Sequence, residues 1–526
     1  MLMSENFDNL QYNSCVSRGI CSVNPRTSAL QNVLGLYLHL CAKYCLKLFE
    51  RDKLDDRVKN VVLNTTAISV LNPECNEHCY MEAIYSLKDI LPEIIKTYNV
   101  IYEETDFEGE NIYNSDIFKK CTNIIDTIKL GEAIFRETVS KIPEKIRDLY
   151  KIILIIAKSI SINILDLESY DCINKTAFKT MLSLINSMNS ENFDEEKLKT
   201  LIHEGAQCNT NLMEELHRVQ ENQYGEQGVY EVSYTTTPSK AVLVVGSNIK
   251  ELEIILKAMQ NKGIDVYTHD EMMLAHTFPK FKEYKILKGQ FGYGVENCLI
   301  DFATFPGPII LTKHSLHNIE NLYRGRLFTT DLNFYKGVIK INDNNFQPVI
   351  DSANESKGFK KGKICETVEI GYNYKECIES IDIKIKAGNY KKFVVIGLKE
   401  YSHNQKEYFE KFVRLLNKDI LIISFSYNFE RENFMYFNTC FDSYAVVRIF
   451  KHILSHNLSA SIFLPKCGRN TIAEMLDFKR YQGVNVFTDE CEPVVINPSL
   501  MNTLREVFEI KPFGSARKDA EFINNL

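Results

Sequence analysis

Two cysteines near the start of the chain are spaced as the ligands of a metal cluster could be. Cys15 and Cys21 lie in NSCVSRGICSVNP, a glycine-containing stretch that precedes the first apolar segment with helical periodicity. A loop can wrap two thiolates around one iron–sulfur cluster, and Arg18 between them could offset their negative charge. This pair is therefore a candidate cluster site.

Two further cysteine pairs have a spacing of four residues. Cys41 and Cys45 share one face of a predicted helix, and Cys75 and Cys79 lie at the start of another, in NPECNEHCYMEA. Two such pairs facing each other could bind a metal ion tetrahedrally. Cysteine on an apolar helix face is usually a small buried hydrophobe instead. The sequence leaves open whether these four residues are ligands or core.

A single cysteine near the C-terminus has basic neighbours. Cys467 lies between Lys466 and Arg469, which could favour its thiolate form, although a plain surface thiol is the commoner case. Thr471 and Glu474, which follow, have the spacing of a capping box at a helix start.

Polar residues that directly follow a predicted strand are the other candidates. His269, Asp270 and Glu271 stand in YTHDEMMLAH, after an apolar strand. Open parallel sheets bind ligands at the carboxyl ends of their strands, but a polar cluster there is more often a helix cap. The turn VVGSN lacks the further glycines of a dinucleotide fingerprint, and the chain has no P-loop, HExxH or paired CxxC motif.

Length and composition restrict the class of protein. The 526 residues suggest three or four domains, and 45% apolar, 11% aromatic and 25% charged residues are ordinary for a globular chain. A net charge of −7 gives no basic surface for nucleic acid. No 18-residue apolar run is free of charge, and the N-terminus has no secretory signal pattern. We therefore expect a cytoplasmic protein without membrane or nucleic-acid partners, whose 15 cysteines are mostly reduced.

The elements that must position these residues fall into two kinds. Up to about residue 223, apolar residues recur at three and four positions, which predicts an N-terminal helical bundle domain that contains the cysteine loop. We interpret ENQYGEQGVYEVSYTTTPSK as a polar linker, and after it strands and amphipathic helices alternate twice, which indicates βαβ units. The predicted fold class is multidomain α and α/β: a helical bundle (1–223) followed by two Rossmann-like α/β domains with parallel sheets (224–362 and 363–526).

Several stretches of the chain are distinctive when taken together and in order. They are NSCVSRGICSVNP, VLVVGSNIKEL, GIDVYTHDEMMLAH, FPGPIILT, RLFTTDL, KKFVVIG, CFDSYAVV and REVFEIKPFGSARKD. These stretches resemble a known family, that of hybrid cluster protein, also called prismane protein or hydroxylamine reductase. The likeness covers nearly the whole chain and implies the same domain order.

The resemblance implies two iron–sulfur centres, of which the first is a 4Fe–4S cubane held by four N-terminal cysteines. Cys15 and Cys21 match the pair in the family's loop, whereas Met3 and Asn6 stand at roughly the positions of the upstream pair. A 4Fe–4S cluster is therefore possible only if other thiolates complete it. A homodimer could share one cluster across its two-fold axis, as related nickel carbon monoxide dehydrogenases do.

The second implied centre is the iron–sulfur–oxygen hybrid cluster, where the family reduces hydroxylamine or nitric oxide. Glu271 matches its first glutamate and Cys440 in CFDSY matches one of its cysteines, so two of eight positions are kept. We expect no intact hybrid cluster, because hydroxyl groups are poor substitutes for thiolates toward iron. The positions that differ, and what the family has there, are Ser247 for histidine, Ser315 and Ser426 for cysteines, Leu398 or Lys399 for the persulfide, and the surroundings of Arg469 and Thr471 for the second glutamate and the lysine.

Three functional hypotheses follow. The first is a catalytically impaired paralogue, a pseudoenzyme that keeps the scaffold for binding or regulation. The second is the family's own oxidoreductase activity toward hydroxylamine or nitric oxide. The third is an electron-transfer or sensing protein with a cluster on Cys15 and Cys21. The sequence does not decide whether the chain is an enzyme and names no electron donor.

Overall fold

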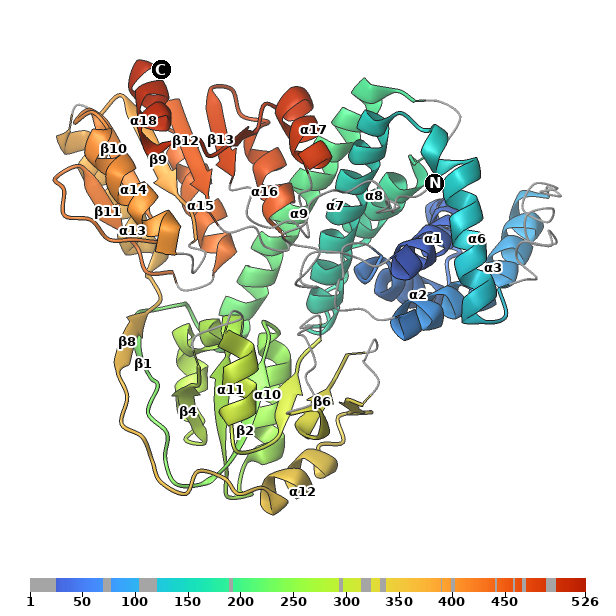
Figure 1. The fold of residues 1–526 in the computed structure, drawn as a ribbon, viewed down its shortest axis with the longest axis horizontal. Coiled ribbons are helices and arrows are strands. Elements are labelled where there is room, and N and C mark those ends of the chain that lie inside the picture. The colour runs from blue at the N-terminus through green and yellow to red at the C-terminus, as the bar shows by residue number, and fades with distance from the viewer. Residues whose placement is uncertain are drawn as a thin grey trace. The chain divides into compact units, whose positions relative to one another are not determined.

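The computed structural model of the chain (Figure 1) shows two compact units. The first consists of Met1–Met213, Cys467–Arg480 and Glu490–Lys511, and the second of Glu214–Lys466, Tyr481–Asp489 and Pro512–Leu526. The described residues are 25–69, 77–103, 121–188, 193–292, 297–313, 323–331, 337–388, 390–398, 403–439, 442–456, 459–465, 470–488 and 498–526.

The first unit is built from helices packed on one another. Every residue of α7 from Ile152 to Ala157 is buried, as expected of a helix at the centre of a bundle. The helices are α1 (Pro25–Glu50), α2 (Asp56–Ala67), α3 (Glu77–Tyr102), α6 (Ile124–Glu137), the 3₁₀ helix η3 (Val139–Lys141), α7 (Glu144–Glu168), α8 (Lys175–Asn186), α9 (Glu195–Tyr224, up to Met213 in this unit), α16 (Thr471–Phe478) and α17 (Pro498–Phe508).

The structure divides one predicted helical stretch. Residues 130–160 have continuous helical periodicity, yet α6 ends at Glu137 and α7 begins at Glu144. Pro143 stands directly before α7 with ψ of 139°. Proline lacks the backbone N–H that a continuing helix needs, so the chain breaks there and starts again.

Two C-terminal helices return to the first unit and pack against α7. The buried carboxylate of Asp148 on α7 accepts hydrogen bonds from Ser499 at 2.5 Å and Thr503 at 3.0 Å, both on α17. Lys151 lies 3.2 Å from the same carboxylate. These bonds satisfy a charge that would otherwise be costly to bury.

The predicted capping box at the start of α16 is wrong. The N-cap residue is Asn470, and the backbone N–H of Glu474 donates to its carbonyl oxygen at 2.9 Å, so the helix starts one residue earlier than a Thr471 cap requires. The Asn470 side chain makes no cap hydrogen bond. Its amide oxygen accepts from Asn209 at 3.3 Å instead, so the side chain bonds to another helix of the first unit and does not cap α16.

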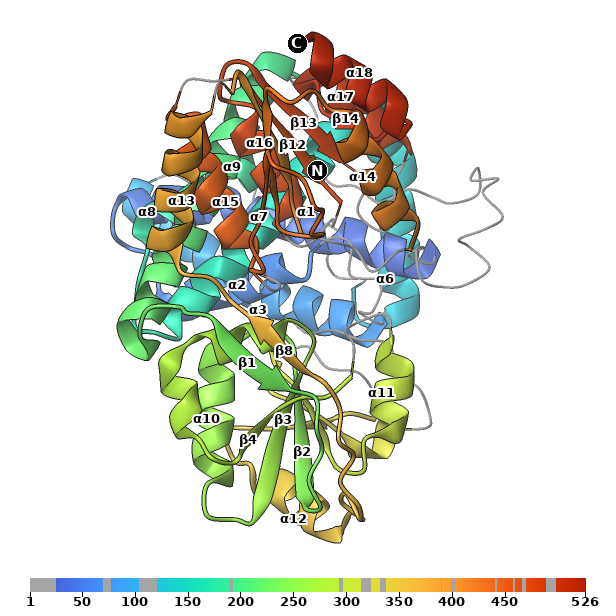
Figure 2. The same cartoon turned by 90° about the vertical axis from the view of Figure 1, so that its left-hand side faces the viewer.

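The second unit contains a six-stranded sheet in which every strand pairing is parallel. Its centre is apolar because Ala241, Leu243 and Val245 of β2 pack against Phe302 and Phe305. Figure 2 shows α10 and α11 on opposite faces. The elements are β2 (Lys240–Val245), α10 (Ile249–Met259), β3 (Ile264–His269), η4 (Asp270–Thr277), η5 (Pro279–Glu283), β4 (Leu287–Gln290), α11 (Cys298–Thr304), β5 (Ile309–Leu311), η7 (Arg324–Arg326), β6 (Leu327–Thr329), β7 (Ile339–Lys340) and α12 (Gln347–Glu355).

The same unit contains a second six-stranded sheet, whose described pairings are also parallel. Phe409 and Phe412 of one helix and Ile523 of another bury one of its faces. Figure 2 shows α14 and α18 on that face and α13 and α15 on the other. The elements are α13 (Tyr374–Ala387), β9 (Lys392–Ile396), α14 (His403–Leu415), β10 (Ile420–Ser424), β11 (Phe434–Tyr436), α15 (Ser443–Leu454), β12 (Ser459–Leu464), β13 (Val484–Thr488), β14 (Lys511–Pro512) and α18 (Ala516–Asn525).

The stretch predicted to be a polar linker is ordered. Helix α9 continues to Tyr224, and β1 (Tyr230–Ser233) then pairs antiparallel with β8 (Thr367–Ile370). The predicted fold class, helical first and then two Rossmann-like parallel sheets, is confirmed. The domain boundaries expected after residues 223 and 362 stay a prediction. No helix within the described ranges combines the length and the apolar character needed to cross a bilayer.

The close approach of α1 and α6 yields a test of the helical unit. Gly131 lies where a β-carbon would overlap the carbonyl oxygen of Ala29, and Asn32 donates to the Gly131 carbonyl at 3.2 Å. We expect Gly131→Ala to cost about 1–3 kcal/mol through overpacking. Thermal unfolding measures the loss. Gly325→Ala is the control, because a β-carbon there meets nothing within 4 Å. Equal unfolding temperatures for the two variants would contradict the packing.

Candidate functional site at the carboxyl ends of the parallel strands

Each sheet has a point at which its strand order reverses. The first sheet has the order β4-β3-β2-β5-β6-β7, so the chain moves outward on one side of β2 and then outward on the other. The second repeats this order as β11-β10-β9-β12-β13-β14. Open parallel sheets bind ligands outside the carboxyl ends of the strands at such a reversal. The candidate positions are therefore those after β2 and β5, and after β9 and β12.

The turn after β2 contains Ser247, the residue in the family's histidine position. Gly246 before it has φ of 122°, which favours glycine, and Asn248 after it caps α10 by accepting from the N–H of Glu251 at 3.0 Å. The turn is thus a well-formed strand-to-helix connection that leaves the Ser247 side chain partly exposed. Ser315, expected to follow β5, lies outside the described residues.

A buried carboxylate joins the loops at this edge. Glu251 accepts from the backbone N–H of Lys313 at 2.9 Å and from the Thr330 hydroxyl at 2.7 Å. Burial raises the pKa of Glu251, and the charge of Lys313 acts in the opposite direction. Glu251 therefore ties the start of α10 to the segments that follow β5 and β6.

Glu271 lies just past β3, in η4, and is half-buried. Its neighbour His269 is fully buried, with Nε2 3.0 Å from Asp301 Oδ2. Asp270 has φ of 60°, a strained value for a residue other than glycine, and Gln290 donates to its carbonyl oxygen at 3.3 Å. The His269 side chain does not cap η4, so the helix-cap interpretation of this cluster is not supported. Of the three predicted residues, only Glu271 presents a partly exposed carboxylate.

Beside the reversal of the second sheet, a serine hydroxyl that follows β10 bonds to the backbone that follows β9. Ser426, after β10, is buried, and its hydroxyl donates to the carbonyl oxygen of Gly397, directly after β9. Leu398, beside this bond, is an apolar residue at 9% exposure. Cys440, Lys399, Arg469 and Cys467 lie outside the described residues, as do Cys15 and Cys21.

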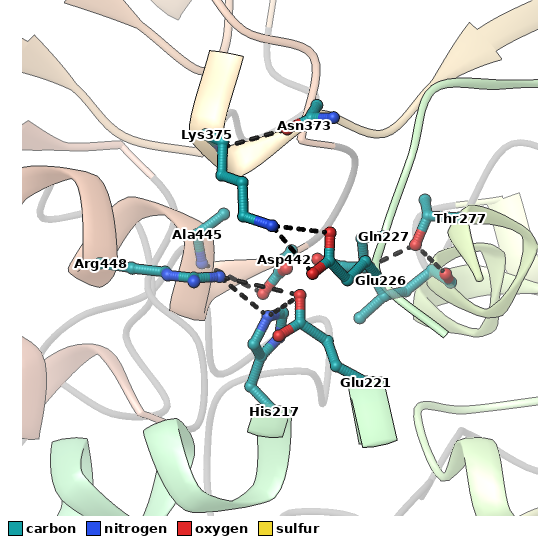
Figure 3. A network of polar contacts seen from close by, with 11 residues as sticks. His217, Glu221, Glu226, Gln227, Thr277, Asn373, Lys375, Asp442, Ala445 and Arg448 are labelled. Carbon is teal, nitrogen blue, oxygen red and sulfur yellow. Dashed lines mark hydrogen bonds and ion pairs between the residues drawn. The ribbon is translucent and has the colours of Figure 1, made fainter. Parts of the chain in front are cut away.

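Figure 3 shows a network of polar and charged side chains that includes Asp442, two residues after Cys440 in the sequence. Arg448 on α15 lies 3.2 Å from His217 Nε2 and 3.8 Å from Glu221 Oε1, both near the end of α9. Its guanidinium also stacks on the ring of Tyr374, 3.4 Å from the centroid. Burial alone would raise the pKa of Glu221, but His217 and Arg448 outweigh it and lower that pKa. Arg448 thus joins the end of α9 to α13 and α15.

Asp442 lies within this network, two residues after Cys440. It is buried and caps α15 by accepting from the N–H of Ala445 at 3.2 Å. Burial raises the pKa of Asp442, while His217 and the Ala445 N–H act in the opposite direction. From the same network, Gln227 donates to the Thr277 hydroxyl at 3.1 Å, at the end of the 3₁₀ helix that contains Glu271.

The network also has an exposed part, which contributes little to stability. Lys375 lies 3.0 Å from Glu226, but both side chains are more than two-thirds exposed, and such pairs are typically worth only about 0–1 kcal/mol.

The helical cysteines are core residues where the structure describes them. Cys41, Cys45 and Cys79 are buried, and burial raises the pKa of Cys41 and of Cys45. Within the described ranges they form no group of three close donor atoms that could hold a metal ion. Cys75 lies outside those ranges, so the four-cysteine site has no structural support.

The sequence analysis missed the network around Arg448. One signal was readable, because His217 and Glu221 are four residues apart on a predicted helical surface. The arginine itself comes from a helix more than two hundred residues later in the chain, and nothing in the sequence links it to that pair.

The chain combines a helical unit with two doubly wound parallel sheets, and polar residues follow the strands of both sheets. This architecture defines a class of multidomain α and α/β protein. Comparison with known sequences identifies the family. The model of the Prismane/CO dehydrogenase family matches residues 11–441, and the chain belongs to this family. The resemblance inferred from the sequence is thereby confirmed.

Relatives match along almost the full length. The hydroxylamine reductase of Thermodesulfovibrio yellowstonii is 25% identical over 541 aligned residues, which cover 97% of this chain and 98% of the relative. That of Acidiphilium cryptum is 23% identical, covering 95% and 94%. A nickel-free carbon monoxide dehydrogenase structure from Thermococcus sp. AM4 covers 98% of this chain and 92% of its own, at 12% identity and a TM-score of 0.47. That score is too low to support a conclusion about the site.

The buried cap of α15 gives a pH-dependent test. Because the pKa of Asp442 is raised in the folded chain, its folding contribution is greatest at low pH and declines as the pH rises through the raised value. We therefore expect Asp442→Asn to gain stability relative to the parent as the pH increases above the ordinary aspartate pKa of about 4. Thermal unfolding between pH 4 and 7 measures the difference.

Asp55→Asn is the matched control, because Asp55 caps α2 in the same way but is exposed to water. A parent that gains stability over Asp442→Asn with rising pH would mean that His217 and Arg448 hold Asp442 as a favourable carboxylate.

Proposed function

We propose that this chain is a family member that keeps the scaffold for binding or regulation and lacks the normal hybrid-cluster chemistry. One observation carries the proposal. Ser426, at a position where the family has a cysteine, directs its hydroxyl to the Gly397 carbonyl within the protein. A hydroxyl held in this way is a weak iron ligand compared with a thiolate.

The other donor groups support the same conclusion. Ser247 stands in the histidine position and Leu398 near the persulfide position, so an imidazole and a sulfur ligand are replaced by a hydroxyl and a hydrocarbon. Each missing thiolate also removes a negative charge that offsets the charge of iron. Glu271 and Cys440 are the two matched positions that remain. This donor set does not fit the hybrid cluster.

The second candidate is an iron–sulfur protein that uses Cys15 and Cys21. Family membership and the spacing of this pair support it. A 4Fe–4S cubane is normally held by four thiolates, so two chains related by a two-fold axis could complete one cluster between them. In that case the protein would be an electron-transfer or sensing homodimer.

Hydroxylamine turnover tests the proposed loss of activity. We expect the anaerobically purified chain to show at most about one-thousandth of the rate of the Thermodesulfovibrio yellowstonii relative measured beside it, since losing transition-state stabilisation of about 4 kcal/mol already costs that factor. Glu271→Gln should change nothing further. Robust turnover that depends on bound iron and disappears in Glu271→Gln would contradict the proposal and favour the family's own reaction.

Iron content and oligomeric state test the second candidate. A shared cluster requires about two irons per chain, from four irons held by two chains. The double variant Cys15→Ser, Cys21→Ser should then lose the iron and the dimer together, while Cys41→Ser, in the helical core, should keep both. If the parent contains no iron, or if the double variant is still a dimer, Cys15 and Cys21 are a remnant without present function.

A further inference from the structure

Three side chains from two helices of the second sheet and from the turn after one of them form a cluster that shares no residue with the sites described above. Asp382 comes from α13, His452 from the last turn of α15, and His456 from just beyond that helix. The Nε2 atoms of His452 and His456 lie 2.9 and 3.0 Å from Asp382 Oδ1, and 3.4 Å from each other. Among the described residues, this is the one group of three or more such side chains whose donor atoms all lie within 4.8 Å.

The separations match one face of a coordination tetrahedron. Zinc–ligand bonds of about 2.0–2.1 Å place neighbouring ligand atoms about 3.3–3.4 Å apart. The two histidine nitrogens already have that separation. The two distances from the histidine nitrogens to Asp382 Oδ1 need to lengthen by only about 0.3–0.5 Å to reach the same separation. This is the difference between two hydrogen-bonded atoms and two ligands of one ion.

Access and charge also suit a cation. The three side chains are between 22% and 32% exposed, so an ion can enter from water and keep water as a further ligand. The carboxyl end of α15 adds the partial negative charge of the helix dipole.

We propose that Asp382, His452 and His456 bind one divalent transition-metal ion, with zinc as the best fit, and leave a fourth position to water. Two imidazoles four residues apart at the C-terminal end of α15 and a carboxylate from α13 are a donor set suited to this class of ion. The bound ion ties α13 to α15 on one face of the second sheet. None of the three residues is a cluster position of the family, so this site stands or falls independently of the proposed function.

The competing interpretation is a hydrogen-bonded clamp without an ion. Both imidazoles can donate from Nε2 to the same carboxylate oxygen, and this arrangement also links the two helices. The two interpretations differ in one measurable respect, which is whether the chain takes up an ion that depends on both histidines.

A zinc titration of the full chain separates the two interpretations. Because the 15 cysteines can also bind zinc, the quantity to compare is the difference between parent and variants. We expect the parent to bind one more zinc ion than His452→Gln or His456→Gln, and zinc to raise its unfolding temperature more. His78→Gln, which removes an exposed histidine elsewhere, should match the parent. Equal zinc stoichiometry in all four proteins would overturn the proposal.

A measurement on the parent alone removes any dependence on variant folding. Histidine acylation, mapped by mass spectrometry with and without zinc, should show protection of His452 and His456 and none of His78. Equal modification of His452 and His456 in both conditions would overturn the proposal in the same way.

Discussion

Parallel strand pairing is the constraint on which the arrangement of this molecule depends. A parallel strand cannot be followed by a hairpin turn, so the chain must cross back over the sheet before it pairs again. All loops after the strands of one sheet then meet at one edge, and the reversal of strand order opens that edge to a ligand. Ser247, Glu271 and Ser426 are brought to such edges by the backbone alone, whatever their side chains can bind.

The topology of the two sheets is therefore set by strand pairing and apolar packing, and not by the side chains at their carboxyl edges. Edges of this kind persist when ligands are lost, because strand pairing and apolar packing do not need the ligand. A polar side chain at such an edge can also bond within the protein, as the Ser426 hydroxyl does with the Gly397 carbonyl oxygen. The carboxylate of Glu251 stabilises the edge of the first sheet in the same way, by accepting from the backbone N–H of Lys313.

The sequence predicted the architecture well because the central strands are short apolar runs between amphipathic helices. It missed elements whose stability is not local. The strand at Tyr230–Ser233 looks like a polar linker, since only pairing with Thr367–Ile370 gives it a partner. The polar cluster that includes Glu271 followed from its place after a strand, whereas Ser247 and Ser426 came from the family resemblance. The network on Arg448 did not follow, and of the Asp382 cluster only the spacing of His452 and His456 was readable, because Asp382 is 70 residues away from His452 in the chain.

The return of α17 to the helical unit has a consequence for how the protein is made. Asp148 and Ser499 are 351 residues apart, so at about 5–20 residues per second the ribosome needs roughly 20 to 70 s to deliver the partner after the carboxylate has emerged. The helices that are synthesised first are thus among the last to acquire all of their packing partners. Until α17 is made, the apolar helices and the Asp148 carboxylate of the nascent chain are exposed to water or bound by a chaperone. A chain whose translation stops before residue 498 lacks α17, so its first unit cannot be completed.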